Sequence, residues 1–176
     1  GGMRMAGLIH LYCGDGKGKT TAALGLALRA SGAGKRVVFT QFFKDGSSSE
    51  IAPLSALPGV RVFHADTARG FYRNMTPEQR EQARRDYTAL FRRAAEEAQG
   101  ADLLILDEMV SACNRGVVPE AQVTAFLEEK PAGLEVVLTG RNPSAALLER
   151  ADYVTEMRKL RHPFDRGIGA RRGIEF

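Results

Sequence analysis

Residues 14–21 read GDGKGKTT, and only Cys13 separates them from an apolar run, Leu8–Tyr12. This order predicts a strand, a tight glycine-rich loop and a helix that begins at Lys19. Backbone N–H groups in such a loop point inward and form a concave anion site. The N-terminus of the following helix adds partial positive charge. The stretch therefore predicts a loop that binds the polyphosphate of a nucleotide.

Two residues of this loop have specific expected roles. Lys19 is expected to reach the distal phosphates, and the Thr20 hydroxyl is expected to coordinate Mg²⁺. The common form of the motif has glycine where this chain has Cys13, so the start of the loop departs from the usual one. The motif indicates polyphosphate binding and leaves the reaction open. The residues expected to contact the nucleotide are Gly14, Asp15, Gly16, Lys17, Gly18, Lys19, Thr20 and Thr21.

A second nucleotide signal is the sequence DLLILDE at residues 102–108. Its four apolar residues predict a buried parallel strand that ends at Asp107 and Glu108, at the sheet edge where open α/β sheets bind ligands. Such carboxylates hold the Mg²⁺ that bridges the phosphates, directly or through water. Residues 134–141, LEVVLTGR, predict a strand that ends at the same edge, so Arg141 is placed for a charge-assisted phosphate contact.

Further apolar runs complete the expected sheet. A helix is expected to start at Thr76, with Pro77 in its first turn and Gln79 three residues after the cap. Apolar residues at three- and four-residue spacing continue this helix to Gly100. The alternation of strands and helices predicts an α/β fold, with a mostly parallel sheet of about six strands covered by helices. The remaining strands are expected at residues 36–42, 59–64 and 151–157.

The composition fits one globular domain over residues 1–176, in which Gly1 and Gly2 before Met3 are interpreted as a cloning remnant. No apolar run reaches the roughly 18–20 residues that span a bilayer. No secretory signal opens the chain, so no membrane partner is expected. Cys13 and Cys113 lie far apart in the sequence, which favours a reduced, cytoplasmic protein.

The net charge of +4 is concentrated in residues 158–176, which hold six Lys and Arg residues against Asp165 and Glu175. A basic end of this kind could hold nucleic acid or an anionic substrate, or could be an ordinary solvated surface. No regular aromatic residues interleave the basic ones, as a single-strand binding surface requires. The sequence therefore predicts no nucleic-acid partner.

With these motifs located, the chain resembles the P-loop corrinoid adenosyltransferases, which transfer the adenosyl group of ATP to cob(I)alamin or its precursors. The resemblance runs from Leu8 to Phe176. The family also lacks glycine at the position of Cys13. The stretches that carry the resemblance are GDGKGKTT at 14–21, QFFK at 41–44, LDE at 106–108, TGR at 139–141, and the end of the chain from ADYVTEM at 151–157 through RHPFDRG at 161–167 to GIEF at 173–176, which other P-loop classes do not share.

The resemblance implies a RecA-like P-loop fold and a homodimer. It implies MgATP and a corrinoid as substrates, and an electron donor such as a reduced flavoprotein. ATP would lie in the reverse of the usual P-loop direction, with C5′ facing the corrinoid. Lys19 and Arg141 would stabilise the triphosphate, and Arg29 would lie near the phosphates. The implied metal ligands are Thr20, Asp107 and Glu108.

Phe71 matches an aromatic residue that the family pushes beneath the corrin ring, and the resemblance therefore gives Phe71 a catalytic role. Displacing the lower ligand of cobalt in this way makes Co(II) easier to reduce. A second position, usually tryptophan in the family, is Arg73 here. Tyr72 could compensate for it, or Phe71 and Tyr72 could be ordinary loop anchors.

Two rival functions stay open on the motifs. A P-loop phosphotransferase or ATPase would use the same loop and the same pair, Asp107 and Glu108, and would produce ADP rather than intact triphosphate. A non-catalytic regulator that binds ATP and a corrinoid would keep the loop and lose the aromatic floor. Arg73 is the residue that favours this second rival.

Overall fold

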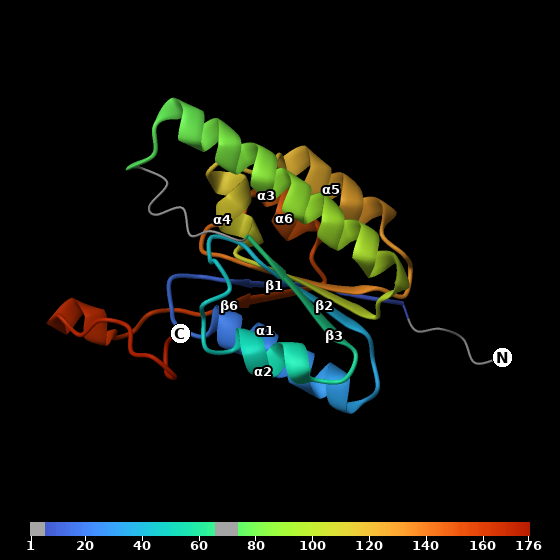
Figure 1. The fold of residues 1–176 in the computed structure, drawn as a ribbon, viewed down its shortest axis with the longest axis horizontal. Helices are drawn as coiled ribbons and strands as arrows, with labels where there is room; N and C mark the ends of the chain where they lie inside the picture. Colours follow the sequence, from blue (N-terminus) through green and yellow to red (C-terminus); the bar gives the residue numbers. More distant parts are fainter. Residues whose placement is uncertain (1–5, 66–73) are drawn as a thin grey trace.

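The computed structural model describes residues 6–65 and 74–176 (Figure 1). At its centre is one six-stranded sheet in the order β3-β2-β4-β5-β1-β6. Every neighbouring pair of these strands is parallel, which confirms the predicted α/β class and the parallel sheet. The strands are β1 (Ile9–Cys13), β2 (Val37–Gln41), β3 (Val60–His64), β4 (Leu103–Asp107), β5 (Glu135–Thr139) and β6 (Tyr153–Glu156).

Helices cover both faces of the sheet (Figure 1). One face carries α1 (Lys19–Gly32) and α2 (Ile51–Ala56). Two 3₁₀ turns, η2 (Ala98–Gly100) and η3 (Pro163–Arg166), lie outside the α-helices. None of the helices within residues 6–65 and 74–176 is long and apolar enough to cross a membrane. The other face carries α3 (Pro77–Glu97), α4 (Met109–Asn114), α5 (Glu120–Glu129) and α6 (Ala145–Arg150).

The alternation of side chains along the strands divides the core into two layers. Toward α1, Phe39 of β2 and Ile105 of β4 pack with Ala23 and Ala27 of the helix. Toward α3, Leu104 packs in a larger cluster of aromatic and aliphatic side chains. All five residues of β2 and of β4 are buried, as expected for central strands of a parallel sheet with both faces covered.

The start of α3 agrees with the sequence. Thr76 Oγ1 accepts a hydrogen bond from Gln79 N at 3.2 Å, and Gln79 Oε1 accepts one from Thr76 N at 2.9 Å. These reciprocal bonds are a capping box. They satisfy the N–H groups of Thr76 and Gln79, which have no acceptor within the helix. The α-helix itself ends at Glu97, and η2 carries the chain on to Gly100, the predicted end.

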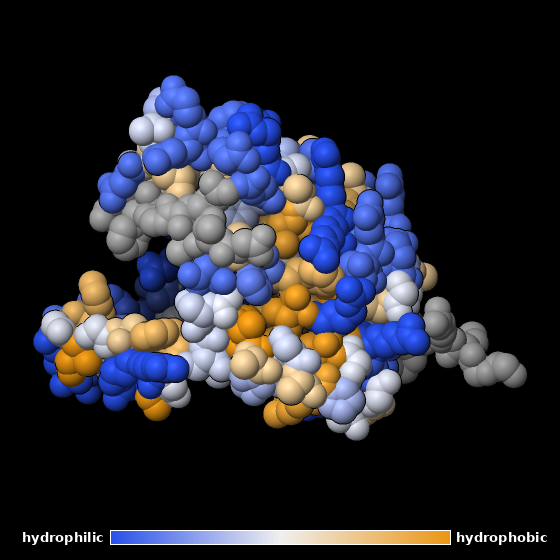
Figure 2. Space-filling model, viewed as in Figure 1, coloured by the Kyte–Doolittle hydropathy of each residue, from blue (hydrophilic) through white to orange (hydrophobic). Residues whose placement is uncertain are grey.

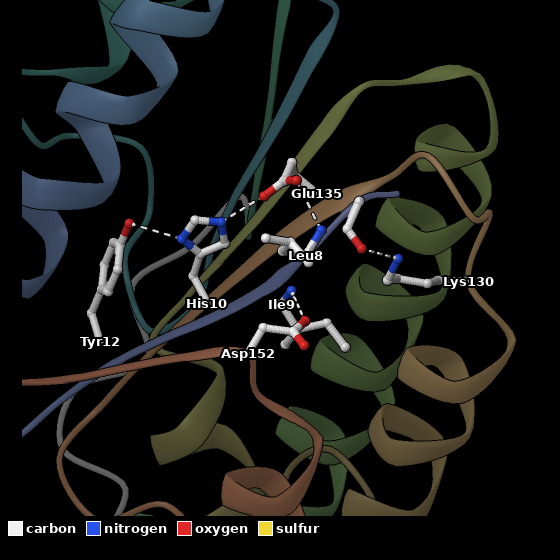
Figure 3. A network of polar contacts seen from close by, with 8 residues as sticks. Leu8, Ile9, His10, Tyr12, Lys130, Glu135 and Asp152 are labelled. Atoms are coloured by element: carbon white, nitrogen blue, oxygen red, sulfur yellow. Dashed lines mark hydrogen bonds and ion pairs between the residues drawn. The ribbon is translucent and has the colours of Figure 1, made fainter. Parts of the chain in front are cut away.

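A polar network ties the beginning of β1 to β5 and β6, at the sheet edge opposite the glycine-rich loop (Figure 3). Glu135 Oε1 accepts from Leu8 N at 2.8 Å, and Glu135 Oε2 lies 2.6 Å from His10 Nε2. Asp152, just before β6, accepts from Ile9 N at 2.8 Å. These contacts fix β1 between its two neighbours, and therefore fix where the loop after β1 begins.

We expect Glu135→Ala to lower the free energy of unfolding by about 1–3 kcal/mol, because it leaves Leu8 N and His10 without their acceptor. Urea denaturation measures this change. Glu135→Gln is the matched control: it keeps an acceptor oxygen for Leu8 N and should lose less. Equal losses for the two variants would contradict the role given to the backbone acceptor.

Candidate nucleotide and metal site

The glycine-rich loop connects β1 to α1 at the C-terminal edge of the sheet. Gly18 has a left-handed φ of 115°, and α1 begins at Lys19 as the sequence predicts. Lys19 Nζ donates to Gly16 O at 2.8 Å, so the ammonium lies folded against its own loop. Burial is the main cause that lowers the pKa of Lys19, and the carboxylate of Glu108 opposes it. The loop is thus a partly buried cationic site.

Asp107, the last residue of β4, joins three elements at this edge. Its Oδ1 accepts from the hydroxyl of Thr20 in α1 at 2.9 Å and from the hydroxyl of Thr139 in β5 at 2.8 Å. The side chain is fully buried. Burial and the neighbouring charge of Glu108 raise the pKa of Asp107 to about 6, although the two hydroxyl donors lower it. A cation placed at this point would relieve the cost of the buried charge.

The second carboxylate oxygen of Asp107 shows whether magnesium fits here. Oδ2 is buried and has no hydrogen-bond partner in the part of the chain that the structure describes. Together with the Thr20 hydroxyl, it supplies the hard oxygen ligands that Mg²⁺ prefers. No group of three or more His, Cys, Asp or Glu residues within 6–65 and 74–176 is placed to hold a metal ion. Mg²⁺ would therefore need phosphate oxygens and water to complete its shell, as it usually does with ATP.

Glu108 adopts a backbone conformation that is uncommon for a residue with a side chain. Its φ is +66°, in the left-handed region. The turn is held by Glu108 N, which donates to Thr139 Oγ1 at 2.8 Å, and by Ser111 Oγ, which donates to the Glu108 carboxylate at 3.0 Å. Strain of this kind concentrates at functional sites. The two adjacent carboxylates thus differ: Asp107 is buried, and Glu108 is partly exposed at the start of α4.

Arg141 lies in a cavity with the loop, as the sequence predicts. This cavity, about 280 Å³ in volume, is lined by Asp15, Gly16, Lys17 and Lys19 of the loop and by Arg141. Its far wall is residues 157–176, which we call the C-terminal segment. The lining residues of that wall are His162, Pro163, Phe164, Ile168, Gly169, Ala170 and Glu175.

The outer surface of the C-terminal segment mixes apolar and charged side chains (Figure 2). Leu160 is 85% exposed and Phe164 is 70% exposed. A second cavity, of about 340 Å³, lies where the end of this segment meets Thr20 and Thr21 of α1, with Lys44 also in its lining. The loop therefore opens on two sides toward the C-terminal segment.

The C-terminal segment is bound directly to the loop. Met157 O accepts from Gly16 N at 2.6 Å, and Asp15 Oδ1 accepts from Lys159 N at 3.0 Å. A Cβ atom at Gly14 would lie 2.4 Å from Met157 O, and one at Gly16 would lie 2.6 Å from it. Glycine is needed at these two positions because the C-terminal segment crosses the loop there. This requirement is separate from the need to bind an anion.

Not every residue of the predicted site gathers at the loop. Arg29 is in the last turn of α1, about 15 Å from Lys19 at about 1.5 Å of helix rise per residue. It lies near Tyr12: burial raises the pKa of that phenol, and the charge of Arg29 partly opposes the rise. A role for Arg29 near the phosphates stays a prediction. Phe71, Tyr72 and Arg73 lie outside the described residues.

Thr139 and the contacts of Met157 were not identified as parts of the site from the sequence. The sequence places Thr139 in the TGR stretch at 139–141 and predicts no separate role for it. Its hydroxyl both donates to Asp107 and accepts from Glu108 N, so it links the two carboxylates. Met157 ends the stretch ADYVTEM, which is part of the resemblance to the family. That stretch does not predict a contact between Met157 and the loop.

A parallel α/β sheet, a glycine-rich loop before α1, and an aspartate of β4 bound to the first threonine of that helix together define a P-loop nucleotide-binding protein. The profile of the family described as "ATP:corrinoid adenosyltransferase BtuR/CobO/CobP" matches residues 5–176. The chain belongs to this family, as its motifs indicated, and the family is one of transferases.

Curated relatives agree with this assignment. A corrinoid adenosyltransferase of Pseudomonas aeruginosa is 35% identical over 173 residues, which cover 97% of this chain and 84% of that protein. The corrinoid adenosyltransferase CobA of Salmonella typhimurium is 33% identical over 172 residues, which cover 97% of this chain and 86% of that protein.

Among solved structures, domain III of the Thermotoga maritima replication initiation protein DnaA is similar, with a TM-score of 0.42 and 15% identity over 88% of this chain and 55% of that chain.

We expect Gly16→Ala to detach the C-terminal segment from the loop, because the added methyl group would lie 2.6 Å from Met157 O. Limited proteolysis should then cut residues 157–176 faster than in the wild type. Gly25→Ala in α1 is the control, since a Cβ there meets nothing within 4 Å. Equal cleavage in the two variants would contradict the contact.

The raised pKa of Asp107 predicts a pH dependence of stability in the metal-free protein. Its value is about 6 in the folded state against 3.8 for a free side chain, so the folded state binds the extra proton between these values. The free energy of unfolding should therefore fall as pH rises from about 4 to about 6, and the loss should persist at higher pH.

Asp107→Asn removes this titration and keeps an acceptor for Thr20 and Thr139. We expect its stability relative to wild type to increase between pH 4 and pH 8, by on the order of 2–3 kcal/mol. Urea denaturation in EDTA across this range measures the difference. Parallel pH profiles for the two proteins would show that Asp107 does not titrate in this window.

Proposed function

We propose that the protein transfers the 5′-deoxyadenosyl group of MgATP to the Co(I) centre of a corrinoid and releases triphosphate. The observation that carries the proposal is the joining of the glycine-rich loop to Asp107 through Thr20, in a chain of the ATP:corrinoid adenosyltransferase family. Relatives in Pseudomonas aeruginosa and Escherichia coli are named corrinoid adenosyltransferases. The product would be adenosylcobalamin or an adenosylated precursor.

In this reaction cobalt(I) supplies the electron pair of the new bond to C5′. The C5′–O bond breaks, and its electron pair leaves with the triphosphate. Cobalt(I) is a strong nucleophile, so no protein side chain needs to act as a base. The protein has two tasks: to align cobalt with C5′, and to stabilise the charge that develops on the leaving triphosphate.

Lys19 and Arg141 are the side chains proposed for the second task, with the loop N–H groups beside them. Support comes from the cavity that these two cations share with Asp15, Gly16 and Lys17. Partial burial of Lys19 makes its charge more effective, because water screens it less. ATP is proposed to lie in the reverse of the usual P-loop direction, so that C5′ rather than the terminal phosphate faces the second substrate.

Thr20, Asp107 and Glu108 would hold the magnesium ion. Support comes from the unpartnered Oδ2 of Asp107 and from the hydroxyl of Thr20 beside it. Bound Mg²⁺ neutralises phosphate charge and makes triphosphate a better leaving group. Asp107 would also keep the Thr20 hydroxyl oriented, through the bond that it already accepts from it.

Other parts of the proposal rest mainly on the family. Phe71 is proposed to lie beneath the corrin ring, and a reduced flavoprotein is a suitable electron donor for making cobalt(I). A homodimer is proposed, and β6, an edge strand of the sheet with all four residues exposed, is a suitable place for a subunit contact. A cytoplasmic location accords with the two free thiols of Cys13 and Cys113.

An anaerobic assay tests the function. Pre-reduced cob(I)alamin, MgATP and the protein are mixed, and the loss of Co(I) absorption is followed together with the phosphate product. Adenosylcobalamin formed with stoichiometric triphosphate is the expected result. ADP, or ATP binding without transfer to any of several corrinoids, would overturn the proposal and favour a phosphotransferase, an ATPase or a regulator.

We expect Lys19→Ala to lower the rate of adenosyl transfer by roughly 10²–10³-fold, because it removes one preorganised charge from the leaving group. Single-turnover kinetics with pre-reduced corrinoid measure the rate of the transfer itself. Lys35→Ala is the control, as it removes the same charge from an exposed residue before β2. A similar loss in both variants would indicate a general effect of net charge.

A further inference from the structure

Three buried side-chain oxygens have no hydrogen-bond partner in the described part of the chain: Thr40 Oγ1, Gln41 Oε1 and Asp107 Oδ2. Two of these oxygens, those of Gln41 and Asp107, lie at the same edge of the sheet. Gln41 and Asp107 are paired in the ladder between β2 and β4, and each is the last residue of its strand. Both side chains are fully buried. Two acceptors without donors therefore end adjacent strands at the same sheet edge.

These two residues also share a face of the sheet. Phe39 and Ile105, two residues earlier on each strand, pack with α1. Because side chains on a strand alternate, Gln41 and Asp107 also face α1, where Thr20 already donates to Asp107. Thr40 faces the other way, into the layer that contains α3. Gln41 thus lies at the proposed metal site, and Thr40 does not.

Glu50 fixes the orientation of the Gln41 amide. Gln41 Nε2 donates to Glu50 Oε1 at 3.3 Å. An ionised carboxylate only accepts hydrogen bonds, so the amide must turn its NH₂ group toward Glu50 and its oxygen away from it. Glu50 lines the 340 Å³ cavity together with Thr20 and Lys44. The glutamine oxygen therefore points away from Glu50 and has no donor from the described residues.

A packing role does not explain this arrangement. Burying an amide oxygen without a donor costs stability, and an apolar side chain of the same length would fill the space without that cost. A bound ligand can supply the donor that the described residues do not. Mg²⁺ keeps several of its waters when it binds with a nucleotide, and those waters donate hydrogen bonds to acceptors around the site.

We propose that Gln41 is a positioning residue for the metal: its Oε1 accepts a hydrogen bond from a water bound to Mg²⁺, beside Asp107 Oδ2. Glu50 holds the amide in the accepting orientation. The inference rests on the MgATP site of the proposed function, and it does not depend on transfer to a corrinoid. It assigns Gln41 to metal-dependent binding of the nucleotide, with no direct contact to the reacting atoms.

The test compares ATP binding with and without metal. Gln41→Met keeps the length of the side chain and removes the oxygen. Calorimetry should show ATP binding about tenfold weaker in Mn²⁺ and unchanged in EDTA, and electron paramagnetic resonance should show the same loss of Mn²⁺ binding in the presence of ATP. Thr40→Val is the matched control: it removes the neighbouring unpartnered oxygen on the opposite face and should change neither measurement.

Gln41→Glu keeps an acceptor oxygen and provides a second test if the methionine variant does not fold. It adds a carboxylate beside Asp107 and Glu50, so the melting temperature should fall without metal and recover with Mn²⁺ and ATP. Affinity for Mn²⁺–ATP at the wild-type level in Gln41→Met, an equal loss in EDTA, or no metal-dependent recovery in Gln41→Glu would each overturn the inference. Failure of the wild type to adenosylate a corrinoid would overturn the proposed function alone, because the binding test contains no corrinoid.

Discussion

The carboxylate of Asp107 is the point on which the site depends. One of its oxygens holds Thr20 of α1 and Thr139 of β5 at hydrogen-bond distance, so the helix after the loop and two central strands are fixed to one buried group. Its other oxygen has no hydrogen-bond partner among the residues that the structure describes. A buried charge that is satisfied on one side only is costly unless a cation meets the other side. The same side chain thus holds these elements together and forms part of the proposed metal site.

The two edges of the sheet are built differently. At the edge where the strands begin, Glu135 and Asp152 satisfy the backbone of β1 with their carboxylates. At the edge where the strands end, Gln41 and Asp107 each keep an acceptor oxygen without a donor from residues 6–65 and 74–176, and Glu108 has a left-handed backbone. The first edge is closed by its own contacts and holds the strands in register. Strain and unsatisfied polar groups are concentrated at the second edge, where a ligand can satisfy them.

The C-terminal segment adds a constraint on the loop from outside the sheet. Met157 and Lys159 bond to Gly16 and Asp15, so the phosphate-binding loop is held from both its own strand and the far end of the chain. Two glycines of the loop, Gly14 and Gly16, leave room for Met157 O, which a Cβ atom would contact at 2.4–2.6 Å. The N–H groups of these two glycines donate to Arg141 O and Met157 O, so both are engaged within the chain.

Local patterns were enough to predict the loop, the start of α1, the capping box of α3 and the strand that ends at Asp107, since each depends on residues a few positions apart. The short helices α4 and α6, of six residues each, gave too little periodicity to be recognised. The roles of Gln41, Thr139 and Met157 also escaped prediction. Asp107 is separated from Thr139 by 32 positions and Asp15 from Lys159 by 144, and such pairs meet only after the strands take their order in the sheet. The sequence by itself determined which groups could bind phosphate and metal, because that is the chemistry of single residues and short motifs. Only the tertiary structure decided which acceptors were left without donors, because that depends on every neighbour that folding brings to a buried atom.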